Sequence, residues 1–550
     1  MALKHVNAVI VGSGAGGGVV ARQLAAAGLS VVLLERGKWY SAADCRKDDL
    51  RNQRTTVLGN AFGPDEERNP RVLVDERGAR TVYPSDGAYS NNAACVGGGT
   101  FSYGAQAWRY MEKDFRMRST YGAVAGSTLE DWPIAYNDLE PYYERAEWEI
   151  GVSGDDTPNI FKAPRRKPLP MPPLAPTREH QILLPAARRL GLHPFDIPML
   201  RNTVPYNGRR SCMRCRWCVG FACELSARNG THNTVIPIAL ATGNCELRTE
   251  CMVREITLDG RARATGVVYF DAQNRLQTQT ADLVVVSAGA VESARLLLNS
   301  RHRFFPNGLG NRYDWVGRNL QGHTYPGAVG LFDYDTFDDL GPGASIAICD
   351  YNHGNPGLAG GGMLANEFIR LPYQFMAQVP PWIPAWGPQH KDFVRKAYRR
   401  TIVIMGPVQE MPLFDSRVQL DPKVKDFWGI PVVRLSGSKH PHTLEIARYL
   451  AGKAEAWLRE AGAIQTWTRI PGSALSGGQH QAGTCRMGDD PQTSVVNRDC
   501  QLHDVDNVYV IDASVHVTNG GFNPALTILA NAYRASDRLL TAWKGSKVQS

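Results

Sequence analysis

Six residues near the N-terminus, Gly12-Ser13-Gly14-Ala15-Gly16-Gly17, constrain the fold more than any other part of the chain. They follow a short apolar run at residues 7–11, and residues 19–27 after them have the composition of a helix that ends at Gly28. A second apolar run follows at residues 31–34. Strand, glycine-rich turn, helix and strand in this order predict the opening βαβ unit of an α/β fold.

The spacing of these glycines fits the G-x-G-x-x-G pattern of dinucleotide-binding turns. We expect Gly12 to make the tight turn, Gly14 to let the backbone approach a pyrophosphate, and Gly17 to allow close helix packing. Glu35 ends the second strand, where a carboxylate accepts hydrogen bonds from a ribose diol and disfavours a 2′-phosphate. The motif leaves FAD and NAD both open. The predicted contacts at this end are Gly12, Gly14, Ala15, Gly17, Glu35 and Arg36.

Length and charge narrow the class of protein. The 550 residues exceed what one hydrophobic core holds, because single cores stop growing near about 250–300 residues. The formal net charge is +8, but Lys and Arg form no long basic run, so we expect no nucleic-acid partner. No apolar run reaches the roughly 18 residues of a membrane-spanning helix, and residues 1–7 lack the features of a signal peptide. A cytoplasmic location is the expectation.

Later segments predict further units. An apolar run followed by a small-residue turn and a helix spans residues 283–299. Residues 163–176 are rich in proline and predict an extended linker. Residues 324–467 include a strand-like run at 430–435 and a polar helix near 442–461, which predicts a separate substrate-facing domain.

Three stretches near the C-terminus, at residues 477–488, 507–512 and 523–527, carry the most specific signal. Together with the N-terminal glycines they resemble the glucose–methanol–choline (GMC) oxidoreductases. This resemblance implies FAD as the cofactor and an α/β fold. A Rossmann-like FAD-binding domain is then joined by a discontinuous α+β substrate-binding domain built on an antiparallel sheet. Further matches in the family's order lie at residues 96–100, 287–290, 292–293, 316–320 and 523–534.

A narrower resemblance concerns the substrate. Residues 107–110, 119–122 and 138–143 resemble the large FAD subunits of bacterial fructose, glucose and gluconate dehydrogenases. This likeness implies a sugar, glycoside or polyol substrate and a possible small partner subunit, with which such chains can be exported to the periplasm. Oxygen, a quinone and a cytochrome stay open as electron acceptors. The alternatives are an enzyme acting on long-chain, aryl or steroid alcohols and a non-catalytic dinucleotide-binding protein.

The resemblance also divides the chain into domains. The predicted bounds are 1–130, 231–322 and 473–550 for the FAD-binding domain, 131–230 for an insertion with the proline-rich linker and a cysteine-rich segment, and 323–472 for the substrate-binding domain. Within the last, the aromatic run Gln374–Trp386 could form an apolar lid or a sugar-stacking surface.

The resemblance assigns a catalytic pair. Alcohol oxidation requires the hydroxyl to lose a proton while the carbon delivers hydride to flavin N5, and an imidazole with a pKa near about 6.5 can take that proton. His480 occupies the family's position for this base, the alternative being a structural histidine. Asn523 aligns with its partner, and we expect its amide to orient the substrate oxygen. Of the other histidines, His323 could border the pocket, whereas His503 and His516 are expected to be structural.

Cofactor contacts are carried over in the same way. The small residues Gly97–Thr100 should pass close to the isoalloxazine ring, because they allow backbone approach. Some relatives attach FAD covalently through a His just after this turn, but Phe101, Ser102 and Tyr103 follow here, which predicts non-covalent FAD. The residues assigned to the cofactor by resemblance are Gly97, Gly98, Gly99, Thr100, Val253, Ala288, Asp512, Ala513, Asn523, Pro524 and Thr527.

Four cysteines, Cys212, Cys215, Cys218 and Cys223, crowd into one short segment. Their spacing is close to that of a ferredoxin-type iron–sulfur ligand set, although it is one residue longer and lacks the final Cys-Pro. Four thiolates this close in sequence are tight for a structural zinc site. An iron–sulfur cluster, another metal, and cysteines without metal are therefore all possible interpretations.

Overall fold

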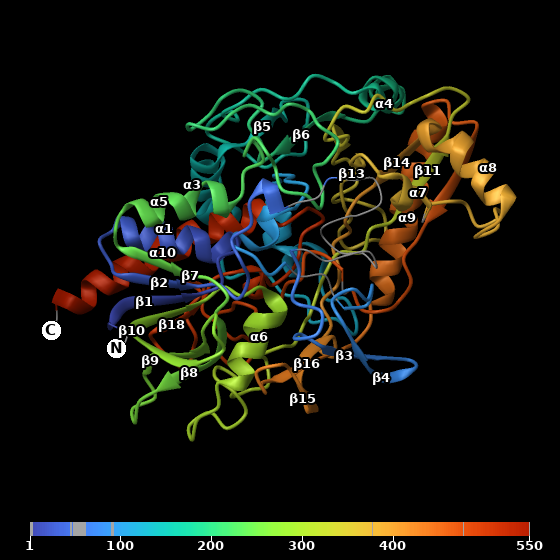
Figure 1. The fold of residues 1–550 in the computed structure, drawn as a ribbon. Coiled ribbons are helices and arrows are strands. Elements are labelled where there is room, and N and C mark those ends of the chain that lie inside the picture. Colours follow the sequence, from blue (N-terminus) through green and yellow to red (C-terminus); the bar gives the residue numbers. More distant parts are fainter. Residues whose placement is uncertain are drawn as a thin grey trace.

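The computed structural model of the chain describes residues 4–44, 47, 62–89, 93–376, 378–476 and 478–548. Gly477, which belongs to the C-terminal signature, lies outside the described residues. Three sheets organise the described part of the chain (Figure 1). No helix in that part is long and apolar enough to cross a membrane.

The first sheet carries the N-terminal glycine turn. Its long strand β10 pairs in parallel with β1 over residues 281–286 and antiparallel with β9 over residues 276–280. One strand thus joins the parallel layer to an antiparallel extension. In spatial order the sheet contains β7 (Cys245–Arg248), β2 (Val31–Leu34), β1 (Val6–Val11), β10 (Leu276–Val286), β9 (Ala264–Phe270) and β8 (Met252–Leu258), with β18 (Val508–Val510) beside β10.

Helix α1 (Ala15–Ala26) follows β1, which confirms the predicted βαβ unit, but it begins within the glycine run, earlier than predicted. A Cβ at Gly16 would stand 1.9 Å from the carbonyl oxygen of Ile511, and one at Gly17 would stand 1.9 Å from that of Gly12. Only glycine fits at either position. The two residues therefore belong to the helix and let its first turn pack directly on the sheet.

The second sheet is antiparallel throughout, as the resemblance predicts for the substrate-binding domain. Strands β5 and β6 come from the segment 131–230, so residues of the predicted insertion complete this sheet. In spatial order it contains β17 (Gln465–Arg469), β11 (Gly327–Leu331), β14 (Thr401–Met405), β13 (Leu364–Asn366), β12 (Ile346–Ile348), β6 (Phe195–Met199) and β5 (Ser153–Asp155).

A third, smaller sheet lies at one side of the molecule (Figure 1). Its strand β16 pairs in parallel with β3, so segments far apart in the sequence meet there. It contains β15 (Arg417–Lys425), β16 (Pro431–Ser436), β3 (Arg71–Asp75) and β4 (Gly78–Val82).

The helices cover the sheets. Helix α1 packs against α5 (Val235–Ala241) and α10 (Ala525–Val548), and α10 packs against α3 (Tyr136–Ala146). Helix α6 (Ala290–Asn299) contacts β8, β15 and β16, and so joins the first and third sheets. The predicted polar helix is α9 (Pro441–Glu460), which packs on β11 and β17 of the second sheet. The remaining α-helices are α2 (Met117–Tyr121), α4 (Arg178–Arg189), α7 (Pro372–Met376) and α8 (Pro388–Ala397).

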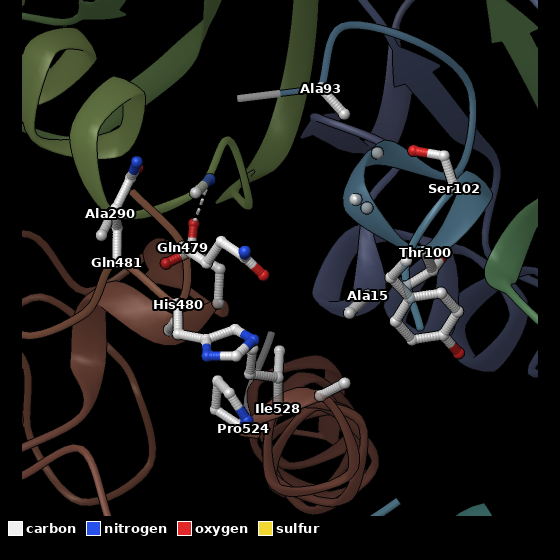
Figure 2. Close-up of a pocket in the computed structure, with 18 of the residues that line it drawn as sticks. Ala15, Ala93, Thr100, Ser102, Ala290, Gln479, His480, Gln481, Pro524 and Ile528 are labelled. Atoms are coloured by element: carbon white, nitrogen blue, oxygen red, sulfur yellow. Dashed lines mark hydrogen bonds between the residues drawn. The ribbon is translucent and has the colours of Figure 1, made fainter. Parts of the chain in front are cut away.

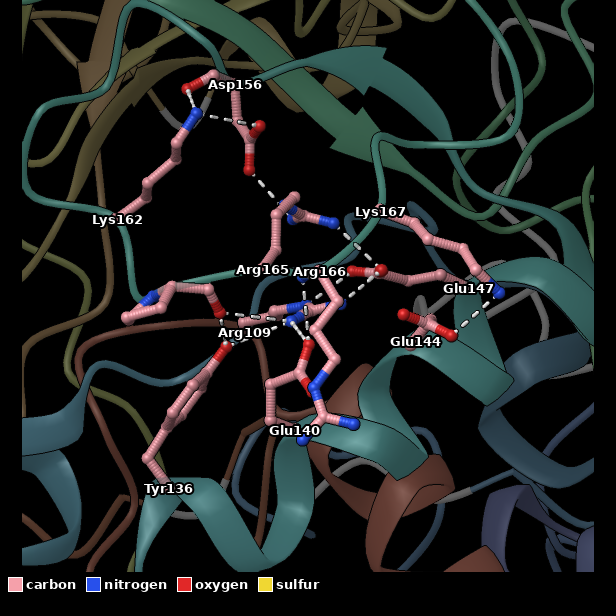
Figure 3. Close-up of polar contacts among 11 residues, drawn as sticks. Arg109, Tyr136, Glu140, Glu144, Glu147, Asp156, Lys162, Arg165, Arg166 and Lys167 are labelled. Carbon is pink, nitrogen blue, oxygen red and sulfur yellow. Dashed lines mark hydrogen bonds and ion pairs between the residues drawn. The ribbon is translucent and has the colours of Figure 1, made fainter.

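The proline-rich segment is extended, as predicted, and a buried ion network fastens it to the helical turn Glu147–Gly151 that follows α3 (Figure 3). The guanidinium of Arg109 donates two hydrogen bonds to Glu147, at 2.8 and 2.6 Å. Arg165, within the proline-rich segment, donates to the same carboxylate at 2.8 Å and to Asp156 at 2.7 Å. Since Arg109 and Glu147 are both buried, this network fixes the path of the segment across the first helices of the insertion.

Candidate active site

A cavity of about 670 Å³ extends from the glycine turn to the C-terminal signature. Most residues that the sequence assigned to the cofactor line it, together with both members of the predicted catalytic pair. In Figure 2 His480 and Gln479 lie on one side of the open space, and Ala15 and Thr100 lie on the other. The predicted residues that line the cavity are Gly12, Gly14, Ala15, Glu35, Arg36, Gly98, Gly99, Thr100, Val253, Ala288, His480, Asp512, Ala513, Asn523 and Pro524.

Three assigned residues, Gly17, Gly97 and Thr527, do not line the cavity. Gly17 packs α1 on the sheet, as described above. The N–H of Gly97 donates to the hydroxyl of Ser13 at 3.1 Å, and its φ of +94° is a conformation that suits glycine. The hydroxyl of Thr527 lies 2.7 Å from that of Tyr143. All three therefore support the residues that line the cavity without lining it themselves.

The glycine turn presents bare backbone to the cavity. A Cβ at Gly14 or at Gly99 would meet no atom within 4 Å, so the space beside both residues is open. Backbone without side chains, at the N-terminus of α1, is the arrangement that accommodates a pyrophosphate. The residues present thus fit the dinucleotide that the sequence predicts.

Glu35 is fixed more tightly than its predicted role requires. Its carboxylate accepts hydrogen bonds from the N–H and the hydroxyl of Ser13, at 3.0 and 2.6 Å, and from the N–H of Gly37 at 2.9 Å. The side chain is buried, yet the residue still lines the cavity. Glu35 therefore joins the end of β2 to the glycine turn, and a ligand bound in the cavity would meet its carboxylate in one fixed position.

Asp512, which follows β18, is likewise held in place by hydrogen bonds from neighbouring turns. Its carboxylate accepts hydrogen bonds from Ser293 Oγ at 2.6 Å, from the N–H of Gly289 at 2.9 Å, and from the N–H of Ser514 at 2.8 Å. The residue lines the cavity at the N-terminus of α6. These bonds hold the signature strand β18 against the turn that precedes α6.

The predicted catalytic pair is linked through Tyr325. The Nδ2 amide of Asn523 donates to the Tyr325 hydroxyl at 3.3 Å, and that hydroxyl lies 3.1 Å from Nδ1 of His480. His480 itself adopts a left-handed backbone conformation, with φ of +61°. Non-glycine residues rarely take such a conformation. Asn519 holds it by donating from Nδ2 to the His480 carbonyl oxygen at 2.7 Å.

A second histidine lies behind the first. His323 Nδ1 is 2.8 Å from His480 Nδ1, and His323 Nε2 is 2.7 Å from the carbonyl oxygen of Gly520. Burial lowers the pKa of His323 to about 4, although the carboxylate of Glu410 opposes that shift. His323 therefore stays neutral at physiological pH.

Sequence reasoning missed Tyr325 and named His323 only as a border of the pocket. Both lie just after the matched residues 316–320, in an extended segment that pairs with the signature through Gln321 and Ala482. Residues two apart in extended chain point to the same side, so this spacing was the available signal.

The other two histidines lie outside the cavity. His516 is buried among the rings of Trp132 and Tyr110, and burial lowers its pKa to about 3. His503 Nε2 lies 2.9 Å from the hydroxyl of Ser494. Neither ring reaches the space beside His480.

Two of the four cysteines of the cysteine-rich segment lie near a buried arginine. Among the described residues, no three or more His, Cys, Asp or Glu side chains gather as a possible metal-binding group. The guanidinium of Arg201 stands between two of the sulfurs, at 3.5 Å from Cys212 and 3.3 Å from Cys218. The buried guanidinium of Arg201 thus already contacts two of the four thiols, and the described residues give the iron–sulfur interpretation no support.

Residues in or after strands β13 and β14 of the second sheet also line the cavity. Polar residues Glu367, Arg370, Gln374 and Gln378 line it, together with apolar residues that include Met363, Phe368, Ile369 and Met405. The aromatic run therefore contributes glutamines to the cavity, whereas Trp382 and Trp386 are 52% and 84% exposed. Trp382 packs edge-on against Trp467, with ring centroids 5.9 Å apart.

Comparison with protein families decides the assignment. An N-terminal GMC oxidoreductase model matches residues 72–325, and a C-terminal one matches residues 412–532. The chain belongs to the GMC oxidoreductase family. This confirms the resemblance and makes the chain an FAD-dependent oxidoreductase of alcohol- or sugar-type substrates.

Individual relatives agree with this family. The chain is 29% identical to the gluconate 2-dehydrogenase flavoprotein of Pantoea cypripedii, over 96% of this chain and 93% of that protein. It is 32% identical to the 6‴-hydroxyparomomycin C oxidase of Streptomyces lividus, over 96% and 90%. A formate oxidase variant of Aspergillus oryzae RIB40 shares the fold, with a TM-score of 0.62, 14% identity and coverage of 99% and 100%.

Proposed function

We propose that this oxidoreductase oxidises a secondary alcohol group of a sugar, glycoside or polyol, with His480 as the base. One observation carries the proposal. His480 and Asn523 line the cavity that begins at the glycine turn, and Tyr325 links them by contacts of 3.1 and 3.3 Å. A non-catalytic dinucleotide-binding protein would have no reason to hold an imidazole and an amide together at this point.

The roles of the two residues follow from their chemistry. The alcohol O–H proton moves to an imidazole nitrogen of His480, and the carbon loses hydride as the C=O bond forms. FAD, when bound, supplies the hydride acceptor. Asn523 has two amide hydrogens and donates one to Tyr325, so the second is available for the alcohol oxygen. A positioned base typically contributes about 10²–10⁴-fold to the rate.

We also propose that FAD is held without a covalent bond. Phe101, Ser102 and Tyr103 follow the flavin-facing turn, and none of them offers a side chain like the histidine that some relatives use. The imidazole of His232 packs against Phe101, with ring centroids 4.9 Å apart, but it does not line the cavity. Acid precipitation should therefore release the flavin into the supernatant.

The preference for a polyol rests on the polar wall of the cavity. Glu367, Arg370 and Gln374 line the same cavity as the catalytic pair and offer both hydrogen-bond donors and acceptors. Sites built to hydrogen-bond a substrate hydroxyl discriminate strongly against analogues that lack it. The names of the relatives, a gluconate dehydrogenase and a hydroxyparomomycin oxidase, point to the same substrate class.

Anaerobic titration tests the proposal. Polyols, sugar acids and aminoglycosides are added to the FAD-loaded protein, with long-chain primary alcohols as the comparison, and the oxidised flavin spectrum is followed. Bleaching by a polyhydroxylated compound is expected, and His480→Ala should retain the flavin but slow its reduction about 10²–10⁴-fold. Bleaching only by long-chain alcohols, or an equal rate in the variant, would contradict the proposal. Oxygen, a quinone analogue and a cytochrome then sort the acceptors, with and without a small partner subunit.

A further inference from the structure

We infer that His323 and Tyr325 are positioning residues that hold His480 in the tautomer whose Nε2 carries the lone pair, and so make Nε2 the proton acceptor. The inference rests on the proposed function of His480 as the base. It concerns which ring nitrogen acts and what selects it.

The hydrogen bond to Gly520 fixes the tautomer of His323. A carbonyl oxygen can only accept, so the 2.7 Å contact requires a hydrogen on His323 Nε2. In a neutral imidazole the other nitrogen then carries the lone pair. His323 Nδ1 is therefore an acceptor, and it points at His480.

Burial keeps His323 in this neutral form. The residue is 7% exposed, and burial lowers its pKa to about 4. The ionisable groups facing it are the carboxylate of Glu410, the buried imidazole of His516 and His480 itself. A protonated His323 would bring N–H against N–H at a separation of 2.8 Å and break the contact with His480.

The tautomer of His480 follows from that of its neighbour. Because His323 Nδ1 accepts, His480 must donate from Nδ1, and its Nε2 then carries the basic lone pair. When Nε2 takes a proton from the alcohol, the Nδ1–H bond to His323 is retained. The base can therefore change charge without turning its ring or exchanging its tautomer.

Tyr325 ties this arrangement to Asn523. Its hydroxyl oxygen lies 3.1 Å from Nδ1 of His480 and accepts from the Asn523 amide at 3.3 Å. His323 and Tyr325 are two residues apart in extended chain, so both reach the same side. Backbone hydrogen bonds of 3.0 Å in both directions between Gln321 and Ala482 hold this segment beside His480.

Variants that remove the acceptor nitrogen of His323 should change both the rate of flavin reduction and its pH dependence. In His323→Leu both tautomers of His480 become available, and flavin reduction should slow measurably, by less than the roughly 10²–10⁴-fold that loss of the base itself costs. The imidazolium also loses the acceptor that favours its charged form, so the acidic limb of the pH–rate profile should move to lower pH. In His323→Asn a carbonyl oxygen can replace Nδ1, and both the rate and the limb should largely recover. Tyr325→Phe should move the limb in the same direction by a smaller amount.

The experiment measures single-turnover reduction of the FAD-loaded protein against pH in the three variants. Tyr121→Phe is the matched control, because the Tyr121 hydroxyl also lies close to a histidine Nδ1, that of His353 at 2.9 Å, but outside the cavity. It should leave the limb in place. A role in folding alone would change the flavin content or the melting temperature and leave the limb unmoved in all variants.

Two outcomes distinguish failure of the positioning role of His323 and Tyr325 from failure of His480 as the base. If His480→Ala is slow but flavin-loaded Tyr325→Phe and His323→Leu keep the wild-type rate and limb, the positioning inference is wrong and the base assignment stands. If His480→Ala reduces flavin at the wild-type rate, the proposed function itself fails. Should His323→Leu yield no folded protein, Tyr325→Phe and His323→Asn still decide, since an unmoved limb in Tyr325→Phe contradicts the inference.

Discussion

The hydroxyl of Ser13 donates a 2.6 Å hydrogen bond to the carboxylate of Glu35 and accepts one of 3.1 Å from the N–H of Gly97. Ser13 is fully buried, and the three residues belong to different parts of the FAD-binding fold. One hydroxyl therefore joins the glycine turn, the end of β2 and the turn assigned to the flavin ring.

Replacement of Ser13 by Ala should weaken FAD binding. The variant leaves the buried Glu35 carboxylate with one donor fewer and the Gly97 N–H without its acceptor. Hydrogen bonds to a charged group contribute about 1.5–3 kcal/mol, so the dissociation constant of FAD should rise about tenfold or more. Reconstitution of apoprotein with FAD measures this. Ser127→Ala removes a comparable hydroxyl, bonded to the Val124 carbonyl at 2.7 Å, and is the control. Equal affinities for both variants would contradict the prediction.

Two glycines of the same turn should fail in different ways. A side chain at Gly14 meets no protein atom within 4 Å of its Cβ, so Gly14→Leu should fold and be colourless because the side chain fills the ligand's space. A Cβ at Gly17 would stand 1.9 Å from the Gly12 carbonyl oxygen, so Gly17→Leu should not fold normally. Circular dichroism and flavin absorbance distinguish the two results. A yellow Gly14→Leu protein would overturn the placement of the pyrophosphate.

The sequence predicted the parts of the fold in which apolar runs and the glycines of a ligand-binding turn lie next to each other. The strand, turn and helix around Gly12 and those before α6 needed no tertiary information, because apolar runs and glycines mark both. The second sheet was predictable only through the family, since β12 and β13 span residues 346–348 and 364–366 and carry no readable period.

The candidate site could likewise be predicted only in part. His480 and Asn523 lie in signature stretches, whereas the contact of His323 with His480 depends on a strand pairing that no local pattern encodes. The contact between Arg201 and the cysteine-rich segment could not be predicted from the cysteine spacing either. Arg201 follows β6, and its guanidinium lies between the sulfurs of Cys212 and Cys218. Nothing in the spacing of the cysteines indicates this arginine.

Acid should destabilise the fold through three buried histidines. Burial lowers the pKa of His323 to about 4 and those of His232 and His516 to about 3, below the unfolded value near about 6.5. Between these values the unfolded chain binds more protons, so the stabilisation present above about pH 6.5 is lost as the pH falls. Each histidine should cost about 2 kcal/mol by about pH 5.

Denaturant unfolding at neutral pH and near pH 5 measures this loss. His516→Phe is the informative variant, because an aromatic ring can pack in the same place against Trp132 and Tyr110 without titrating. It should lose less stability on acidification than the wild-type chain. An identical pH dependence of the two proteins would show that His516 is not neutral in the folded state.

The buried ion network should make Arg109 a stability residue with little influence on the chemistry. Arg109→Met leaves Glu147, which is fully buried, and Glu140, nearly so, with fewer partners. Breaking a buried pair costs about 3–5 kcal/mol, because an uncompensated charge remains. Arg166→Met is the matched control: Arg166 also pairs with Glu140, at 2.9 Å, but is 69% exposed, so its loss should cost less than about 1 kcal/mol.

Urea unfolding compares the free energies of unfolding of the two variants. Because Arg109 does not line the cavity, the surviving folded Arg109→Met protein should reduce its flavin at the wild-type rate. Equal destabilisation by the two variants would mean that Arg165 alone suffices to hold Glu147.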